Sequence, residues 1–337
     1  MPASRLGRRH FLAGAAGATI IPCAARTATT PYRIAFANIN EARGVPIEGL
    51  GFTGLDVRRG FELAARTLPV DIIYYDNAAD AETAVSNAVD AISQKVDLLI
   101  EYNADISANP EIARRMAAAN IPVLAINYPV GDTPIYTYDN LAAGRIAGRA
   151  LGAFSKQSWP DDIPVAVILG DVGDPTDAVT QRIKGIVEAL HAEFPDVELT
   201  LLDTGGQPQR GDGLLTKFML QQPRRKVLVA TLDDPTAVWA KAAVELAIRI
   251  NDCVIVSQGL DRSIHGGASE KKELDPTNRA SVVLGSVAYY LDRYGYQVLP
   301  LALRMLKGEL VPARTVTQHI LVTATNIFRE YPPTDMN

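Results

Sequence analysis

Polar side chains that could bind a small molecule recur where predicted strands end in this chain of 337 residues. The set comprises Asn38, Asn40, Asn127, Tyr128, Asp139, Asp171, Asp233, Asp234 and Asp261, joined by Arg182 near the start of a predicted helix. These groups offer both hydrogen-bond donors and acceptors, and a hydroxyl group uses both. They therefore predict a site for a small, neutral, polyhydroxylated ligand. The competing interpretation is that each Asn or Asp only caps a helix or forms a turn.

The elements that must position these residues alternate between strand and helix. Apolar runs predict strands over 32–40, 70–75, 96–100 and 121–127, and again over 165–169, 197–202, 227–231 and 254–257. Continuous apolar strands separated by helices are typical of parallel sheets covered on both faces. The predicted fold class is therefore α/β, with two similar domains, each a parallel sheet flanked by helices. Ligands of such sheets bind at the carboxyl ends of the strands.

The last part of the chain has a different pattern. It contains residues 281–290, a predicted helix over 294–306 and a strand-like run over 316–323. We expect none of these to extend either of the two strand-and-helix series. We interpret them as the chain crossing back between the domains. The predicted N-terminal lobe comprises residues 32–138 plus about 289–316, and the C-terminal lobe comprises residues 139–288 plus about 317–330.

The first 28 residues have the order of an export signal. Arg5, Arg8 and Arg9 precede a short apolar run that ends in small residues, as in a secretory signal peptide. The run Arg8-Arg9-His10-Phe11-Leu12 resembles the twin-arginine export motif. We predict a periplasmic protein with a signal peptide over residues 1–28, and lipid attachment at Cys23 stays open.

Composition and motifs exclude several classes of function. A net charge of −5 gives no basic field for nucleic acid. Two cysteines and four scattered histidines show no metal-ligand spacing. Neither a GxSxG elbow nor a phosphate-binding loop occurs. We therefore predict no catalytic residues, no metal and no cofactor.

Several short motifs carry a family resemblance. They are Asp139–Gly144, Gln181–Gly185, Gly259–Asp261, Gly285–Val287 with Tyr294-Gly295, and Leu306–Gly308. Together they make residues 32–325 resemble the periplasmic sugar-binding proteins of the ribose-binding type, which deliver ligand to ABC importers. The resemblance implies a type I periplasmic binding protein fold with a multi-strand hinge.

The same resemblance implies roles for particular residues. Arg182 matches an arginine of the family that donates hydrogen bonds to sugar hydroxyls, and Asp261 matches an aspartate that accepts hydrogen bonds from them. Asn127 falls where the family has a sugar-binding aspartate, and Asp233 or Asp234 where it has an asparagine. In the unliganded protein, we expect the Arg182 side chain to face an open, wet cleft.

Other members of the predicted site are Asn40, Tyr128, Asp139 and Tyr289, of which Tyr289 falls near a hinge-side polar contact of the family. The sequence departs from the family pattern after the first strand. The paired aromatics that stack on the sugar are absent, a longer loop over 41–51 intervenes, and Phe52 is the only aromatic residue nearby. Phe52 is therefore the predicted aromatic contact.

An alternative is an exported oxidoreductase that uses NAD or NADP. Gly49, Gly51 and Gly54 have the spacing of a dinucleotide-binding fingerprint, and Asp76 lies where a ribose-binding acid belongs. Eight residues separate the predicted strand from Gly49, whereas the fingerprint needs its first glycine directly after the strand.

The sequence thus predicts a monomeric binding protein that closes over a sugar-like ligand by hinge motion. Its predicted partner is an ABC permease. A membrane receptor is the alternative, in which case the chain is the ligand-binding subunit of a sensor.

Overall fold

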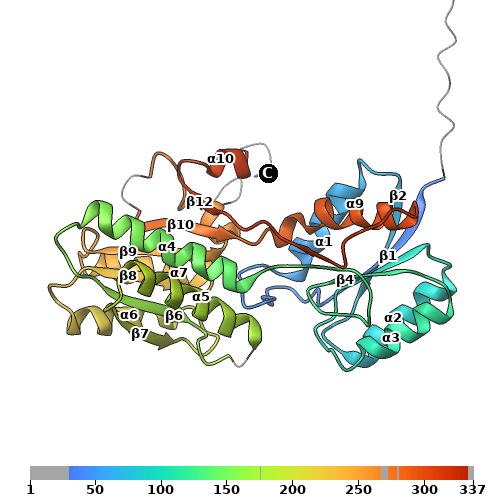
Figure 1. Cartoon of the computed structure of the whole chain (residues 1–337), viewed down its shortest axis with the longest axis horizontal. Helices are drawn as coiled ribbons and strands as arrows, with labels where there is room; N and C mark the ends of the chain where they lie inside the picture. The colour runs from blue at the N-terminus through green and yellow to red at the C-terminus, as the bar shows by residue number, and fades with distance from the viewer. Residues whose placement is uncertain (1–29, 175, 267–271, 279–280, 333–337) are drawn as a thin grey trace, which may run out of the picture. The chain divides into compact units, whose positions relative to one another are not determined.

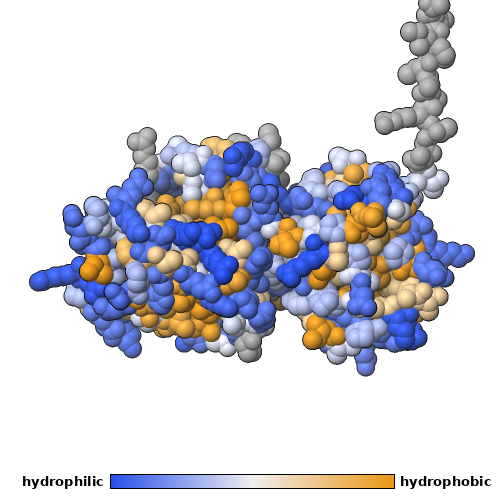
Figure 2. Space-filling model, in the orientation of Figure 1, coloured by the Kyte–Doolittle hydropathy of each residue, from blue (hydrophilic) through white to orange (hydrophobic). Residues whose placement is uncertain are grey.

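The computed structural model describes residues 30–332, except 175, 267–271 and 279–280. The predicted signal peptide, with its paired arginines and Cys23, lies outside the described residues. Among the described helices, none combines the length and the apolar character that a membrane crossing requires. On the face in Figure 2, polar and apolar side chains are interspersed, as is usual for folded proteins.

The first sheet is wholly parallel and contains six strands in the order β11-β5-β4-β3-β1-β2. Its strands are β1 (Tyr32–Asn38), β2 (Val70–Asp76), β3 (Leu98–Glu101), β4 (Val123–Ile126), β5 (Ile135–Thr137) and β11 (Arg314–Val316). Its helices are α1 (Gly54–Ala65), α2 (Ala81–Ser93), α3 (Asn109–Ala118) and α9 (Tyr294–Leu306). Figure 1 shows α1 and α9 on one face of this sheet and α2 and α3 on the other.

Strand β1 shows why both faces of the sheet are covered. Ile34 and Phe36 point toward α1 and α9, while Ala35 and Ala37 point toward α2 and α3. The Phe36 ring stacks on Phe61 of α1 with ring centroids 3.9 Å apart. Because successive side chains of a strand point to opposite faces, an unbroken apolar run needs an apolar layer on each side.

The second sheet also has six strands, in the order β12-β10-β9-β8-β6-β7, and only β12 runs antiparallel to its neighbour. Its strands are β6 (Val165–Gly170), β7 (Glu198–Asp203), β8 (Val227–Thr231), β9 (Cys253–Gly259), β10 (Val283–Ala288) and β12 (Leu321–Thr323). Helices α4 (Asn140–Ser158) and α5 (Asp177–Glu193) cover one face, and α6 (Arg210–Gln221) and α7 (Asp234–Leu246) cover the other. The short elements are α8 (Arg262–His265), the 3-10 helix η1 (Leu291–Arg293) and α10 (Ile327–Glu330).

The predicted α/β fold class with two helix-flanked sheets is confirmed, but the expectation for the last part of the chain is wrong. Strand β10 extends the second sheet, pairing in parallel with β9. The run over 316–323 divides between two sheets, since β11 pairs with β5 and β12 pairs with β10. A short apolar run does not show which distant strand it joins, so the sequence pattern could not assign these strands.

Candidate functional site

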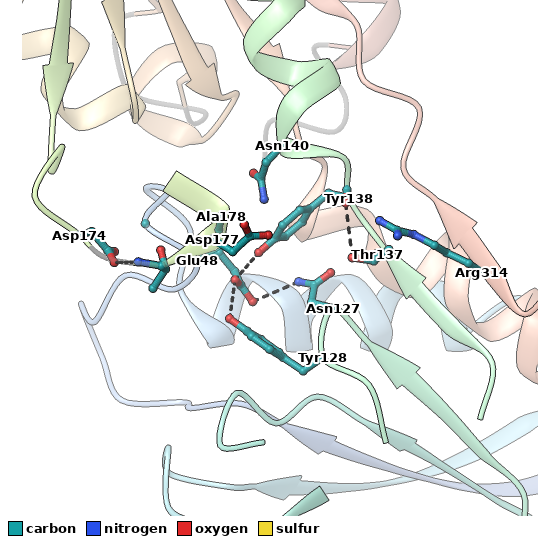
Figure 3. Close-up of a pocket in the computed structure, with 12 residues that line it drawn as sticks. Glu48, Asn127, Tyr128, Thr137, Tyr138, Asn140, Asp174, Asp177, Ala178 and Arg314 are labelled. Carbon is teal, nitrogen blue, oxygen red and sulfur yellow. Dashed lines mark hydrogen bonds between the residues drawn. The ribbon is translucent and has the colours of Figure 1, made fainter. Parts of the chain in front are cut away.

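A pocket of about 500 Å³ opens where the carboxyl ends of strands from both sheets face each other. It is lined by Glu48, Gly49, Asn127, Tyr128, Thr137, Tyr138, Asn140, Asp174, Thr176, Asp177, Ala178 and Arg314. Figure 3 shows Glu48 near its centre, with Arg314 and Asp174 at opposite sides. The walls combine amides, hydroxyls, carboxylates, a guanidinium and two tyrosine rings, which is the mixture of donors and acceptors that a polyhydroxylated ligand requires.

The Glu48 carboxylate is the centre of a hydrogen-bond cluster in this pocket. One oxygen accepts from the Tyr102 hydroxyl and, at 3.1 Å, from Asn127 Nδ2. The other accepts from the Tyr138 hydroxyl and, at 2.9 Å, from the Tyr128 hydroxyl. Burial, reinforced by the charge of Glu48, raises the pKa of Tyr102 and Tyr138 well above the ordinary value, so both hydroxyls stay protonated and donate. Four donors occupy the acceptor positions of this carboxylate.

Arg182 does not face an open cleft, and that expectation is wrong. Its side chain has 0% exposure. Nη1 donates to the main-chain oxygens of Gly49 and Leu232, both at 3.0 Å, and Nη2 donates to the main-chain oxygen of Glu48 at 2.6 Å. The guanidinium also lies 5.7 Å from the Tyr289 ring centroid, within cation–π range. Arg182 therefore joins α5 to the loop that follows β1.

Asp261 and Asp234, at strand ends of the second sheet, are both buried and accept hydrogen bonds within the protein, although Asp261 Oδ2 has no hydrogen-bond partner. Asp261 caps α8, accepting from Ser263 N at 2.7 Å, and burial raises its pKa to about 6. Asp234 has 0% exposure and accepts from the hydroxyls of Ser257 and Ser286 and from Asp261 N. Burial raises the Asp234 pKa well above the ordinary value, which favours its neutral form. Asp234 holds the ends of β9 and β10 together.

Four other predicted site residues have structural contacts instead of lining the pocket. Asn40 forms a turn in which its Oδ1 accepts from Ala42 N at 2.9 Å. Asp139 caps α4 and Asp233 caps α7, accepting from Ala142 N at 2.9 Å and from Thr236 N at 2.7 Å. Phe52 lies in the apolar core with 1% exposure, so its ring is not at the pocket wall.

The remaining predicted residues are near one another. Asn127 and Tyr128 line the pocket directly. Tyr289 is buried beside it, and its hydroxyl lies 3.1 Å from Asn140 Oδ1 and 3.0 Å from Gln258 Oε1. The structure thus brings Asn127, Tyr128 and Tyr289 to one region.

Sequence reasoning missed Glu48, Tyr102, Tyr138, Asp177 and Arg314 as members or neighbours of the site. Tyr102 and Tyr138 follow strands β3 and β5 directly, so the strand-end rule, applied to every strand, could have found them. Glu48 had no such signal, because it lies in the middle of a loop and meets its partners only in the folded chain.

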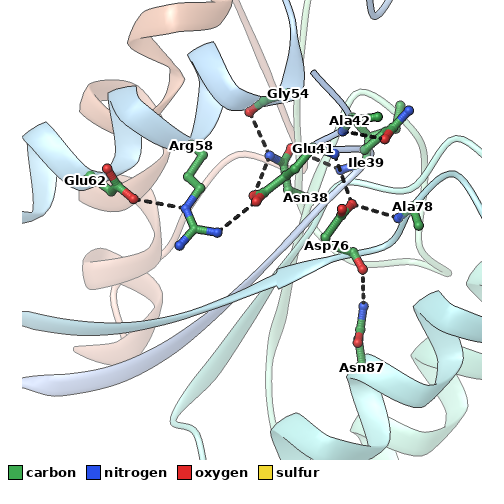
Figure 4. A network of polar contacts seen from close by, with 11 residues as sticks. Asn38, Ile39, Glu41, Ala42, Gly54, Arg58, Glu62, Asp76, Ala78 and Asn87 are labelled. Atoms are coloured by element: carbon green, nitrogen blue, oxygen red, sulfur yellow. Dashed lines mark hydrogen bonds and ion pairs between the residues drawn. The ribbon is translucent and has the colours of Figure 1, made fainter. Parts of the chain in front are cut away.

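The glycines of the apparent dinucleotide fingerprint have packing roles. A Cβ at Gly54 would overlap the main-chain oxygen of Asn40, and Figure 4 shows Asn38 Nδ2 donating to Gly54 O. The first turn of α1 is capped by Thr53 and Asp56, which form a capping box. The Asp56 carboxylate thus occupies the end of the helix at which a dinucleotide-binding fingerprint would bind pyrophosphate.

Asp76, the predicted ribose-binding acid, also has a local role. Its Oδ1 accepts from Glu41 N at 3.0 Å and from Ala78 N at 2.8 Å (Figure 4). These contacts tie the loop after β1 to the loop after β2 and give no support to the oxidoreductase alternative. In the part of the chain that the structure describes, no group of three or more His, Cys, Asp and Glu side chains is placed to bind a metal ion.

Comparison with known proteins identifies the family. Residues 51–310 match the family model described as "Periplasmic binding protein domain". The chain belongs to this family. The predicted resemblance to the periplasmic binding proteins is thereby confirmed. A search of curated proteins finds no match to the sequence.

Solved structures of low sequence identity share the fold of this periplasmic binding protein. The glucose-galactose binding protein GanP from Geobacillus stearothermophilus has 19% identity and a TM-score of 0.62, covering 88% of this chain and 99% of its own. A periplasmic solute-binding protein of an ABC transporter from Actinobacillus succinogenes, with bound D-allose, has 16% identity and a TM-score of 0.67 over 88% and 99%. A Mycobacterium smegmatis protein in complex with β-D-fucofuranose has 18% identity and a TM-score of 0.65 over 90% and 96%.

Proposed function

We propose that this protein is a periplasmic solute-binding protein that binds a sugar or a related polyol and presents it to an ABC importer. Membership of the periplasmic binding protein family supports the binding role. The structures named with D-allose and β-D-fucofuranose support a sugar as the ligand class. On this proposal the protein catalyses no reaction and works as a monomer.

The single observation that carries the proposal is the pocket between the two sheets. Its volume of about 500 Å³ lies within the range of roughly 300–1,000 Å³ found for small-molecule sites. Donors from Asn127, Asn140 and Arg314 and acceptors from Asp174 and Asp177 are contributed by both sides. A ligand in this pocket would contact both sheets at once.

We infer that ligand binding couples to hinge closure. The chain passes between the sheets after β5, after β10 and after β11, so the proposed lobes are residues 32–138 plus about 289–316 and residues 139–288 plus about 317–330. A ligand held from both sides stabilises the closed arrangement and shifts the population toward it. The importer would then recognise the closed surface.

A ligand panel tests the function. D-allose, D-arabinose, D-galactose and allitol, with NAD and NADP as the competing class, are added singly to the purified protein. A sugar at about 100 times its Kd stabilises the fold by roughly 2.7 kcal/mol, which raises the Tm by about 5 °C at this chain length. A Tm shift with NAD or NADP and none with a broad set of sugars and polyols refutes the proposal.

A further inference from the structure

The position between Arg182 and Asp261 is filled by the chain itself. The segment Pro46–Phe52, here called the 46–52 loop, folds back between β1 and α1 and is closed by a hydrogen bond of 2.8 Å from Ile47 N to Phe52 O. Arg182 donates to the main-chain oxygens of Glu48 and Gly49 in this loop. Those two carbonyls occupy the place where hydroxyls of a ligand would accept from the guanidinium.

Asp261 meets the same loop from another side. A Cβ at Gly51 would overlap the Asp261 carboxylate and lie 2.9 Å from Pro235 Cδ. The backbone of the loop therefore packs directly against Asp261 Oδ2, and only a residue without a side chain fits at position 51. Glycine is the residue that permits such a close approach. Arg182 and Asp261, two of the side chains that the family resemblance assigns to the sugar, thus contact the 46–52 loop.

The loop is firmly attached to the first sheet. Ile47, Leu50 and Phe52 are all buried in the apolar core. The Glu48 side chain accepts hydrogen bonds from three tyrosine hydroxyls and from Asn127. A ligand that displaced the loop would bring three apolar side chains into water and leave four donors without their acceptor, both of which are unfavourable.

The pocket of about 500 Å³ borders the loop on the side of Asn140 and Arg314, here called the outer side, and a smaller volume of about 110 Å³ lies beside Pro46 and Leu50. Glu48 and Gly49 form the floor of the pocket, and Asn140 and Arg314 line another part of it (Figure 3). Asp174, in the loop before α5, and Asp177, the first residue of α5, also line it. We propose that the 46–52 loop is a fixed wall of the binding site and that the sugar binds on its outer side, contacting Asn140, Asp177 and Arg314. Arg182 is a positioning residue that holds the loop by hydrogen bonds, and Asp261 Oδ2 packs against Gly51 without one. This inference rests on the proposed function for the identity of the ligand.

A disulfide that holds the loop in place tests whether it moves. An ideal Cβ at Gly49 points toward α5 and lies 4.0 Å from Val179 Cγ2, and Val179 is not among the residues that line the pocket. The full chain carrying Gly49→Cys, Val179→Cys and Cys23→Ser is oxidised without ligand, and the reduced form of the same variant serves as the control. The disulfide is expected to form, and the oxidised protein is expected to bind the sugar found in the panel with a Kd within about threefold of the reduced protein. Absence of the disulfide, or loss of binding on oxidation that reduction restores, overturns the proposal.

Substitutions locate the sugar. Asn140→Ala and Arg314→Ala are each expected to weaken its binding at least tenfold, which is the effect of losing one strong hydrogen bond. Arg304→Ala is the matched control, because Arg304 pairs with Glu309 outside the pocket. Unchanged Kd values in the first two variants, with a tenfold loss in Arg182→Lys, would place the ligand at Arg182 and refute the outer site. If no sugar binds the unmodified protein, the proposed function fails, whereas formation of the disulfide still tests the position of the loop.

Discussion

Replacement of Glu48 tests the hydrogen-bond cluster that fixes the 46–52 loop. In Glu48→Gln the side chain keeps its volume, but one acceptor oxygen becomes an amide nitrogen that can only donate. Two of the four donors that surround Glu48 then face another donor. Glu48→Ala removes the acceptor from all four.

The expected magnitude follows from the burial of those donors. Tyr102 is fully buried and Tyr138 nearly so, and a buried donor without an acceptor costs about 1–3 kcal/mol. Because Glu48 borders the pocket, water can reach part of the cluster and reduce that cost. We therefore expect Glu48→Gln to lower the free energy of unfolding by about 2–4 kcal/mol, and Glu48→Ala to lower it by at least as much.

Urea or guanidinium unfolding followed by circular dichroism measures this change. Glu198→Gln is the control, since that side chain is 66% exposed in an ion pair with Arg225 on the surface and should change the free energy of unfolding by less than about 0.5 kcal/mol. A Glu48→Gln protein as stable as the control would show that the carboxylate is not bound by the tyrosines, and the argument for a fixed loop would lose its main contact.

Three further predictions concern pH, export and packing. Burial raises the pKa of Glu101 to about 8; an acid with a raised folded pKa stabilises the fold at low pH, and this stability is lost as pH rises through that value. Between about pH 6.5 and 9, the free energy of unfolding, measured from denaturant curves, should fall by about 2 kcal/mol more in the unmodified protein than in Glu101→Gln. An equal fall in both proteins would contradict the raised pKa of Glu101. Replacing Arg8 and Arg9 by lysine keeps the charge but loses the twin-arginine pattern, so the precursor should accumulate in the cytoplasm. Immunoblots of cell fractions measure this, and normal delivery to the periplasm would exclude the twin-arginine route. Gly54→Ala places a methyl group against a main-chain oxygen and should destabilise the fold by about 1–3 kcal/mol, whereas Gly213→Ala in α6, with nothing within 4 Å of the new Cβ, should leave thermal stability unchanged or raise it.

Local patterns in the sequence determined the order of strands and helices and the presence of two parallel sheets. Apolar side chains on both faces of β1 require covering layers whatever the rest of the chain does. The same patterns placed Asn127 and Tyr128 at strand ends, and those two residues line the pocket. The physical reason is that the spacing of apolar residues within a strand or helix depends on only a few neighbouring residues, so it can be recognised in the sequence before the fold is known.

Only the tertiary structure decided which polar strand-end groups serve the pocket. Asp139, Asp233 and Asp261 each cap the helix that follows, because a carboxylate can accept from its own helix or from a ligand, and composition does not distinguish the two. Glu48 meets Tyr138 from 90 positions away, and Arg182 meets the Glu48 carbonyl from 134 positions away. Such contacts depend on how distant elements pack, and so the packing of the 46–52 loop against Arg182 could be found only in the folded protein.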